Sequence, residues 1–292
     1  MYQQVLFPTD GSDGAALAFG HAIEVARAYD ATLHVLHVAD TTRLDLLDLA
    51  DTERIATRLE RQGRLLVDEA AARVEPHGVD VVTTVARGDP PHEIVARAAA
   101  DGADLVVMPT HGRRGLERLL LGSTTEGVLH GAETPVLTVR PAEETRVAFP
   151  YRSVLVATDG SPVADHALDH GVAVAGETGA ALHLLSVAET GTVPGAGRTE
   201  SARETLTEAA ELVVEDAATR AEAAGVAPVD AAVVVGASVH GTIEEYVEEE
   251  DVSLVVVGTH GLTGLDRVLG SVADHLVRTA SVPVLVVPGE RD

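Results

Sequence analysis

Short apolar runs alternate along the chain with longer segments in which apolar residues recur every three or four positions. The runs at residues 105–108 and 254–257 are apolar without interruption, which is typical of strands buried on both faces. Ile55, Leu59 and Leu66 show the helical period in one of the longer segments. In the first half of the chain, this pattern predicts strands at residues 4–8, 32–38, 80–86, 105–108 and 136–139, and helices at residues 13–29, 51–75, 91–100 and 123–130.

The pattern of elements occurs twice because the sequence contains an internal repeat. Residues 9–12, which read Thr-Asp-Gly-Ser, return 149 positions later as residues 158–161, and Thr110-His111-Gly112 returns at the same offset. Gly122-Ser123 returns as Gly270-Ser271 after only 148 positions, so the second copy has lost one residue just before this point. The repeat predicts two homologous domains.

The order of elements predicts the fold of both domains. We expect domain 1 at residues 1–142 and domain 2 at residues 151–292, joined by a linker at residues 143–150. Strands that alternate with helices form a parallel sheet with right-handed crossovers. Each domain should therefore be a doubly wound, Rossmann-like α/β domain, with a five-stranded parallel sheet and helices on both faces.

Composition narrows the chemistry that these domains can perform. All 21 residues counted as Lys or Arg are Arg, and the chain contains no Cys. The lack of Lys excludes Schiff-base chemistry and a Walker A phosphate loop, and the lack of Cys excludes thiol nucleophiles and thiolate metal sites. The formal net charge of −25 argues against nucleic acid and anionic membranes as partners. Such an acid excess resembles the composition of proteins from salt-loving organisms, in which concentrated salt screens the repulsion.

The sequence also favours a cytoplasmic location. Residues 5–7 begin an apolar strand directly, without the basic region, apolar stretch and small-residue cleavage site of a secretory signal. No uninterrupted apolar stretch approaches the roughly 18 residues that a membrane-spanning helix needs.

The first candidate motif, residues 9–12, directly follows the first predicted strand. In a doubly wound sheet, ligands bind outside the carboxyl ends of the strands, where the strand order reverses. Asp10 at this edge could accept hydrogen bonds from ribose hydroxyls or bind a divalent metal ion. The alternative is that Asp10 or Ser12 merely caps the next helix, which for this motif alone is the commoner outcome.

The second candidate motif is a glycine-rich segment that follows the fourth strand. It contains Gly112 and Gly115, and then Gly122-Ser123-Thr124 at the start of a predicted helix. Glycine lets the backbone approach an anion closely, and the amides of a helix start bind phosphate with help from the helix dipole. Glycine after a strand is usually only a turn, but this segment recurs in both copies, on the same side of the sheet as the Asp motif. The recurrence favours a nucleotide site.

Together these motifs resemble the ATP-binding branch of the universal stress protein family, over essentially the whole chain. The family's pattern is Gly, two residues, Gly, nine residues and then Gly-Ser or Gly-Thr, with an Asp after the first strand. The first copy keeps the nine-residue spacing from Gly112 to Gly122 but has Pro109 in place of the first Gly. The second copy has both glycines but only eight residues before Gly270.

The resemblance implies an adenine nucleotide alpha hydrolase-like fold that binds ATP or another adenine nucleotide, with Mg²⁺ as an accompanying ion. In the first copy it assigns nucleotide contacts to Thr9, Asp10, Val38, Gly112, Gly122, Ser123 and Thr124, and the nearby Arg113 is a candidate phosphate clamp. In the second copy it assigns them to Thr158, Asp159, Val187, Gly258, Gly261, Gly270, Ser271 and Val272. Asp10 and Asp159 are the candidate metal ligands.

We rank the first site above the second. Its loop spacing is intact, and residues 1–150 carry a net charge of −9 against −16 for residues 151–292, so a polyanionic ligand meets less repulsion there. Among the histidines, His34 and His37 should face opposite sides of their strand, which argues against joint metal binding.

Three classes of function remain open. A nucleotide-binding stress-response or regulatory protein with at most slow hydrolysis fits best, because no dedicated base or nucleophile accompanies the motifs. An ATP-using enzyme of the same fold would need a Ser-Gly-Gly-x-Asp-Ser loop, which residues 9–12 do not provide. A structural interaction protein that binds no nucleotide remains an alternative, because Pro109 and the shortened second loop depart from the family's pattern.

The last predicted strand of each domain, at residues 135–139 and 283–287, would leave an apolar sheet edge that proteins usually cover. In the family this strand mediates dimerisation. The resemblance therefore implies that the two domains pair through these strands as an intramolecular pseudo-dimer, with a homodimer of the whole chain as a further option.

Overall fold

The computed structural model describes residues 1–42, 49–111, 121–189, 200–260 and 269–289. The chain divides into two compact units, Met1–Glu143 and Glu144–Asp292. Within the described ranges, both units are built from parallel strands that alternate with helices, as the sequence predicts.

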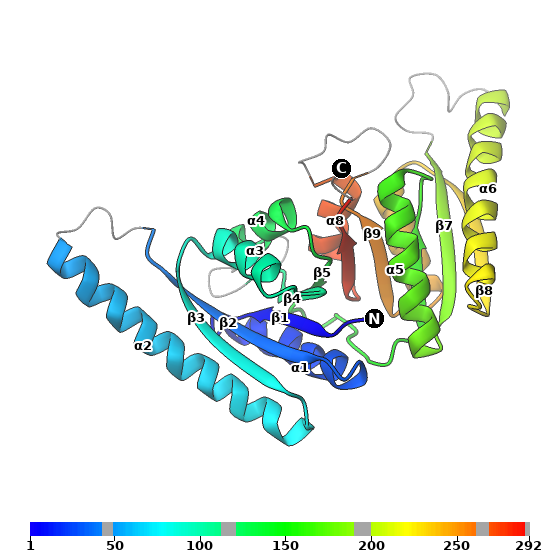
Figure 1. Cartoon of the computed structure of the whole chain (residues 1–292). Coiled ribbons are helices and arrows are strands. Elements are labelled where there is room, and N and C mark those ends of the chain that lie inside the picture. Colours follow the sequence, from blue (N-terminus) through cyan, green and yellow to red (C-terminus); the bar gives the residue numbers. More distant parts are fainter. Residues whose placement is uncertain (43–48, 112–120, 190–199, 261–268, 290–292) are drawn as a thin grey trace. The chain divides into compact units, whose positions relative to one another are not determined.

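The first unit is a doubly wound α/β domain. Its elements are β1 (Gln4–Pro8), α1 (Asp13–Ala28), β2 (Thr32–Asp40), α2 (Leu49–Val74), the short 3-10 helix η2 (Glu75–His77), β3 (Val81–Gly88), α3 (Pro90–Ala100), β4 (Leu105–Pro109), α4 (Ser123–Gly131) and β5 (Val136–Val139). The strands lie in the order β3-β2-β1-β4-β5, and all neighbours are parallel. Figure 1 shows α1 and α2 along one face of the strands and α3 and α4 along the other.

The second unit repeats this topology. Its elements are β6 (Ser153–Ala157), α5 (Pro162–Thr178), β7 (Ala181–Glu189), α6 (Glu200–Ala223), β8 (Val229–Gly236), α7 (Val239–Glu249), β9 (Leu254–Gly258), α8 (Ser271–Thr279) and β10 (Val284–Val287). The strands lie in the order β8-β7-β6-β9-β10 and are again parallel. In both units the order therefore reverses at the first strand, between β1 and β4 and between β6 and β9.

The uninterrupted apolar runs form the central strands. All five residues of β4 and the first four of β9 are buried, because helices cover both faces of the sheet. The cores are made mainly of Val, Leu and Ala, and the rings of Phe7 and Phe19 pack in the first with their centroids 4.9 Å apart. These packed strands hold the strand ends, and hence the candidate site, in fixed positions.

The observed elements differ slightly from the predicted ones. Strand β2 continues to Asp40 instead of ending at residue 38, because its pairing with β3 continues as far as Gly88. Among the described helices, none has the length and apolar character needed to span a bilayer.

Candidate functional site

The two candidate motifs meet where the strand order reverses. Strands β1 and β4 are direct neighbours, with Val5 opposite Leu105 and Leu6 opposite Val106. Since both strands run in the same direction, the Thr-Asp loop after β1 and the segment after β4 leave the sheet at the same edge. Doubly wound domains bind their ligands at this edge of the sheet, where the strand order reverses.

The Thr-Asp loop is fixed by hydrogen bonds within itself and to β2. The Thr9 amide donates to the carbonyl of Leu36 at 2.8 Å, and the Gly11 amide donates to the Thr9 hydroxyl at 3.1 Å. Ser12 donates its amide to Asp10 Oδ1 at 2.9 Å. Gly11 has a φ of +71°, a conformation that glycine adopts without strain. The loop therefore presents the Asp10 carboxylate in one defined orientation.

Of the two residues considered as helix caps, Ser12 performs that role. Its hydroxyl accepts the amide of Ala15 at 3.3 Å and so caps the start of α1. Asp10 instead closes the turn before the helix. Ser12 therefore caps α1, and the Asp10 carboxylate stabilises the turn that precedes it.

The second unit builds the same loop. Thr158 donates its amide to the carbonyl of Leu185 at 2.9 Å, and Ser161 donates its amide to Asp159 Oδ1 at 3.0 Å. The Ser161 hydroxyl caps α5 by accepting the amide of Ala164 at 3.2 Å. The repeat in sequence is therefore also a repeat in hydrogen bonding.

Helix α4 begins at the same edge of the sheet as the Thr-Asp loop. The amide of Gly122 donates to the carbonyl of Thr110 at 2.8 Å, which ties the helix start to the end of β4. A Cβ on Gly122 would lie 3.3 Å from both the Thr110 oxygen and the His111 Cα, so a side chain would crowd this contact. Within the described residues no side chain caps α4, and the amides at Ser123 and Thr124 begin the helix with its favourable dipole for an anion.

The start of α8 in the second unit has the same construction. The amide of Gly270 donates to the carbonyl of Thr259, and a Cβ on Gly270 would lie 3.0 Å from that oxygen. No side chain of the described residues caps α8, which begins at Ser271. The one-residue deletion before Gly270 has therefore not changed how the helix start is anchored.

Pro109, the departure from the family's glycine, has a structural counterpart on the neighbouring helix. In the second unit, a Cβ on Gly258 would lie 2.8 Å from Val163 Cγ1 and 3.1 Å from the Val163 oxygen, so the strand needs glycine there. In the first unit, the residue at the position of Val163 is Gly14. The small residue lies on the helix in one unit and on the strand in the other. A Cβ on Gly14 would lie 3.0 Å from the His111 oxygen and 3.3 Å from Pro141 Cγ, so this helix needs glycine beside the end of β4. The start of α4 is still anchored as in the second unit, through the amide of Gly122.

His111 adds an imidazole at the end of β4. Its Nδ1 lies 3.2 Å from the Thr110 hydroxyl. Partial burial lowers the pKa of His111, and the nearby charge of Arg140 lowers it further, so the ring is neutral at pH 7. Arg140 directly follows β5 and is itself buried. The sequence could have indicated Arg140 as a residue of the candidate site. It directly follows β5, which is parallel to β4 and so ends at the same edge of the sheet.

Three of the expected contacts, Gly112, Arg113 and Gly261, lie outside the described residues. The roles of these residues, including the Arg113 phosphate clamp, remain predictions. Val38 and Val187 occupy corresponding positions near the ends of β2 and β7, each paired with the neighbouring edge strand.

Two histidines of β2 have separate contacts. His34 and His37 face opposite sides of the sheet, as predicted: His34 contacts Thr84 and Asp101, whereas His37 contacts the Thr9 carbonyl. In the described part of the chain, no three His, Asp or Glu side chains are placed to hold a metal ion.

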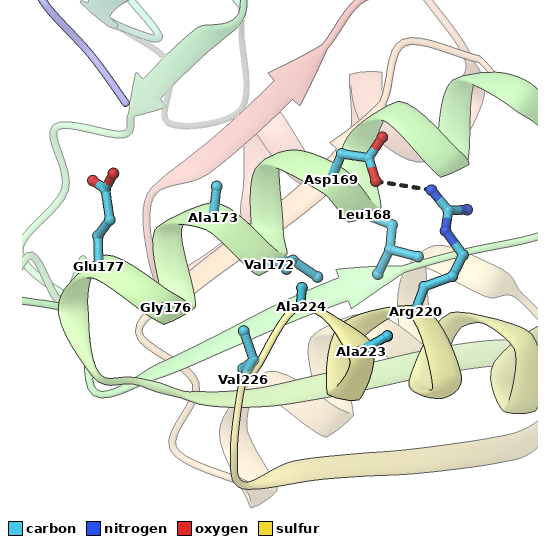
Figure 2. A pocket seen from close by; sticks show the side chains of 10 residues that line it. All are labelled: Leu168, Asp169, Val172, Ala173, Gly176, Glu177, Arg220, Ala223, Ala224 and Val226. Atoms are coloured by element: carbon cyan, nitrogen blue, oxygen red, sulfur yellow. Dashed lines mark hydrogen bonds and ion pairs between the residues drawn. The ribbon is translucent and has the colours of Figure 1, made fainter.

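A groove in the second unit lies away from the candidate site. Figure 2 shows it between α5 and the C-terminal end of α6, with the Asp169–Arg220 ion pair at its rim. The groove has a volume of about 580 Å³ and is lined mainly by small apolar residues. Because α5 runs opposite to the strands, its C-terminal half lies at the amino edge of the sheet. The groove is therefore separate from the loops at the carboxyl edge.

Comparison with known proteins agrees with this architecture. The model of the Universal stress protein family matches residues 1–140 and again residues 150–288. A universal stress protein of Mycolicibacterium smegmatis is 30% identical over 300 residues, which cover 97% of this chain and 96% of the relative. Another, from Methanocaldococcus jannaschii, is 38% identical over 141 residues, or 48% of this chain and 83% of the relative. The crystal structure of a universal stress protein from Archaeoglobus fulgidus aligns over 98% of both chains, with a TM-score of 0.73 and 26% identity.

Proposed function

The chain belongs to the universal stress protein family as a tandem pair of its domains, and on that basis we propose that it is a stress-response or regulatory protein that binds an adenine nucleotide. The nucleotide, ATP or a relative of it, would lie at the carboxyl edge of the sheet. The first domain is the preferred site.

One observation carries this proposal. In each domain, an Asp-containing loop and a helix start without a side-chain cap lie at the point where the strand order reverses, within the described residues. The first supplies acceptors for ribose hydroxyls, and the second supplies amide donors for phosphate. A nucleotide combines these two chemistries in one molecule.

The residues divide the ligand between them. Thr9 and Asp10 would contact the ribose, Val38 would offer backbone groups to adenine, and Gly122, Ser123 and Thr124 would contact phosphate. Their counterparts in the second domain are Thr158, Asp159, Val187, Gly258, Gly270, Ser271 and Val272. Gly112, Arg113 and Gly261 complete the proposed contacts. A Mg²⁺ ion would be held mainly by the phosphates, with Asp10 or Asp159 as a single protein ligand, which is usual for this ion.

Hydrolysis is expected to be slow. His111 lies beside Gly122 at the start of α4, but its ring is neutral and its Nδ1 is engaged with Thr110. We propose a role in which the bound nucleotide sets a conformational state.

The direct test is mass spectrometry of nucleotide released from the purified protein, followed by calorimetric titration with ATP in several-molar KCl. Asp10→Asn removes the negative charge but keeps the oxygen that accepts the Ser12 amide, so it should fold and bind ATP about tenfold or more weakly. Asp159→Asn is the matched variant in the second domain. The absence of nucleotide on the purified protein, together with no ATP binding, would refute this function and favour a structural interaction protein.

We also propose that the two domains pair through β5 and β10, the strands that would otherwise leave an apolar sheet edge. Cysteine pairs placed in these two strands should form disulfides under oxidation, because the chain has no other Cys. If only intermolecular disulfides formed, the intramolecular pairing would be wrong.

A further inference from the structure

His37 joins the Thr-Asp loop of the first domain to helix α2. Its Nδ1 lies 2.9 Å from the carbonyl oxygen of Thr9. Because a carbonyl oxygen can only accept a hydrogen bond, the ring must carry a proton on Nδ1 and donate it. Thr9 is thereby bound twice to β2, through its amide to Leu36 and through its carbonyl to His37.

The imidazole fits because α2 has a glycine opposite it. A Cβ on Gly63 would overlap the His37 ring at Cδ2 and would lie 3.2 Å from its Nε2. The same Cβ would lie 3.1 Å from Val85 of β3. The ring is therefore enclosed between the helix and the sheet, which fixes the direction of its Nδ1–H bond.

The second domain has a different pair of residues at these two positions. Buried residues align the helices, since Val67, Ala70 and Val74 of α2 correspond to Val214, Ala217 and Ala221 of α6. This alignment places Ala210 at the position of Gly63, and the strand alignment places Ser186 at the position of His37.

The consequence appears at the Thr-Asp loop. Its other hydrogen bonds are the same in both domains, including those of Thr158, Gly160 and Ser161. Within the described part of the chain, however, no side chain donates to the carbonyl of Thr158. The domains thus differ by one hydrogen bond at this loop. The first domain has His37 with Gly63 at the two positions, and the second has Ser186 with Ala210.

We propose that His37 is a positioning residue that holds Thr9 and Asp10 in the nucleotide-binding geometry, and that this additional hold makes the first domain the tighter site. The inference rests on the proposed function, since it concerns the affinity of that same site. His37 itself need not touch the nucleotide. It acts through Thr9, by removing the freedom of the loop to move before binding.

The test replaces His37 and Gly63 of the first domain with the residue types found at the same positions of the second domain, Ser and Ala. His37→Ser with Gly63→Ala reproduces the packing found at Ser186 and Ala210, and should restore the thermal stability that Gly63→Ala alone loses through overlap with the ring. The matched control is His37→Asn with Gly63 unchanged, in which the Asn amide can donate from the place of Nδ1 while its oxygen takes the place of Cδ2.

The measurement is photo-crosslinking of the full chain with 8-azido-ATP at increasing concentration, with labelled peptides assigned to each domain by mass spectrometry. In the Ser and Ala variant, half-maximal labelling of the first domain should require about three- to tenfold more nucleotide, as expected for one hydrogen bond. Labelling of the second domain should not change, and the Asn control should stay close to the wild type.

Two results separate the possible failures. If the Ser and Ala variant melts like the wild type and labels its first domain at the same nucleotide concentration, His37 has no positioning role and the inference is wrong. If neither domain of the wild-type protein is labelled above a competed background, the proposed function fails and this inference falls with it.

Discussion

Protonation of His21 should limit the stability of the first domain in acid. The side chain lies in α1 with 2% of its surface exposed, and burial lowers its pKa from 6.5 to about 4. In the unfolded chain the ring regains its ordinary pKa, so between these two values the unfolded state binds more protons than the folded state. Stability is therefore complete above about pH 6.5 and is lost as the pH falls toward 4.

The size of the effect follows from these two pKa values. Proton linkage gives a loss of about 2.5 kcal/mol between about pH 8 and pH 4.5 for this one residue. That is a substantial part of the roughly 5–15 kcal/mol by which a domain is usually stable. His170, the counterpart in α5, also has a pKa lowered chiefly by burial, so it should act in the same direction in the second domain.

The assay compares urea unfolding of the wild type and of His21→Leu over this pH range at constant KCl. Leucine keeps an apolar side chain in the helix but cannot titrate, and all other groups titrate equally in both proteins. The variant should gain about 2.5 kcal/mol relative to the wild type as the pH falls. A difference in unfolding free energy that stayed constant to within about 0.5 kcal/mol across this range would show that His21 does not take up a proton on unfolding.

Three further results are expected. Gly20→Ala should stabilise the protein by about 0.4–1 kcal/mol, since a Cβ there meets nothing within 4 Å. Gly171→Ala should destabilise it by about 1–3 kcal/mol, since its Cβ would overlap Val156. Thermal unfolding that moved both variants in the same direction would contradict this packing. Asp101→Ala should cost about 1–3 kcal/mol by urea unfolding, because it removes the partner 2.7 Å from His34 Nδ1, and an unchanged midpoint would exclude a contribution from this bond. Raising KCl from low to molar concentration should raise the melting temperature, because salt screens the repulsion within a chain of net charge −25, and a flat salt dependence would argue against adaptation to salt.

The fold could be predicted from the sequence because its signals are local. Strands buried on both faces appear as uninterrupted apolar runs, as in β4 and β9, and the repeat shows that both halves share one topology. The same reasoning placed the Thr-Asp loop and the start of α4 at one edge, because the carboxyl ends of parallel strands must lie together. These inferences need only the order and direction of the elements.

Contacts between elements could not be predicted in this way. Gly63 is 26 residues from His37, and their contact depends on how α2 is rotated against the sheet. Pro109 looked like a defect in the glycine pattern, because only the structure pairs the glycine at position 258 with Val163 on the neighbouring helix. The sequence also left open which residue caps α1, since Asp10 and Ser12 are both good capping residues and only hydrogen-bond geometry separates them.

The exchange of glycine between strand and helix has a consequence for how the gene can evolve. The two repeats share one topology, yet their parts are not interchangeable. A crossover between the first helix and the fourth strand of a repeat would join Val163 of one copy to Pro109 of the other, or Gly14 to Gly258. The first product would crowd the helix against the strand, because Val163 already lies within 2.8 Å of where a Cβ at position 258 would stand, and the second would lack a side chain at both positions. Such paired differences should therefore protect the separate identity of the two halves, because recombinants that mix them fold less well than either parent.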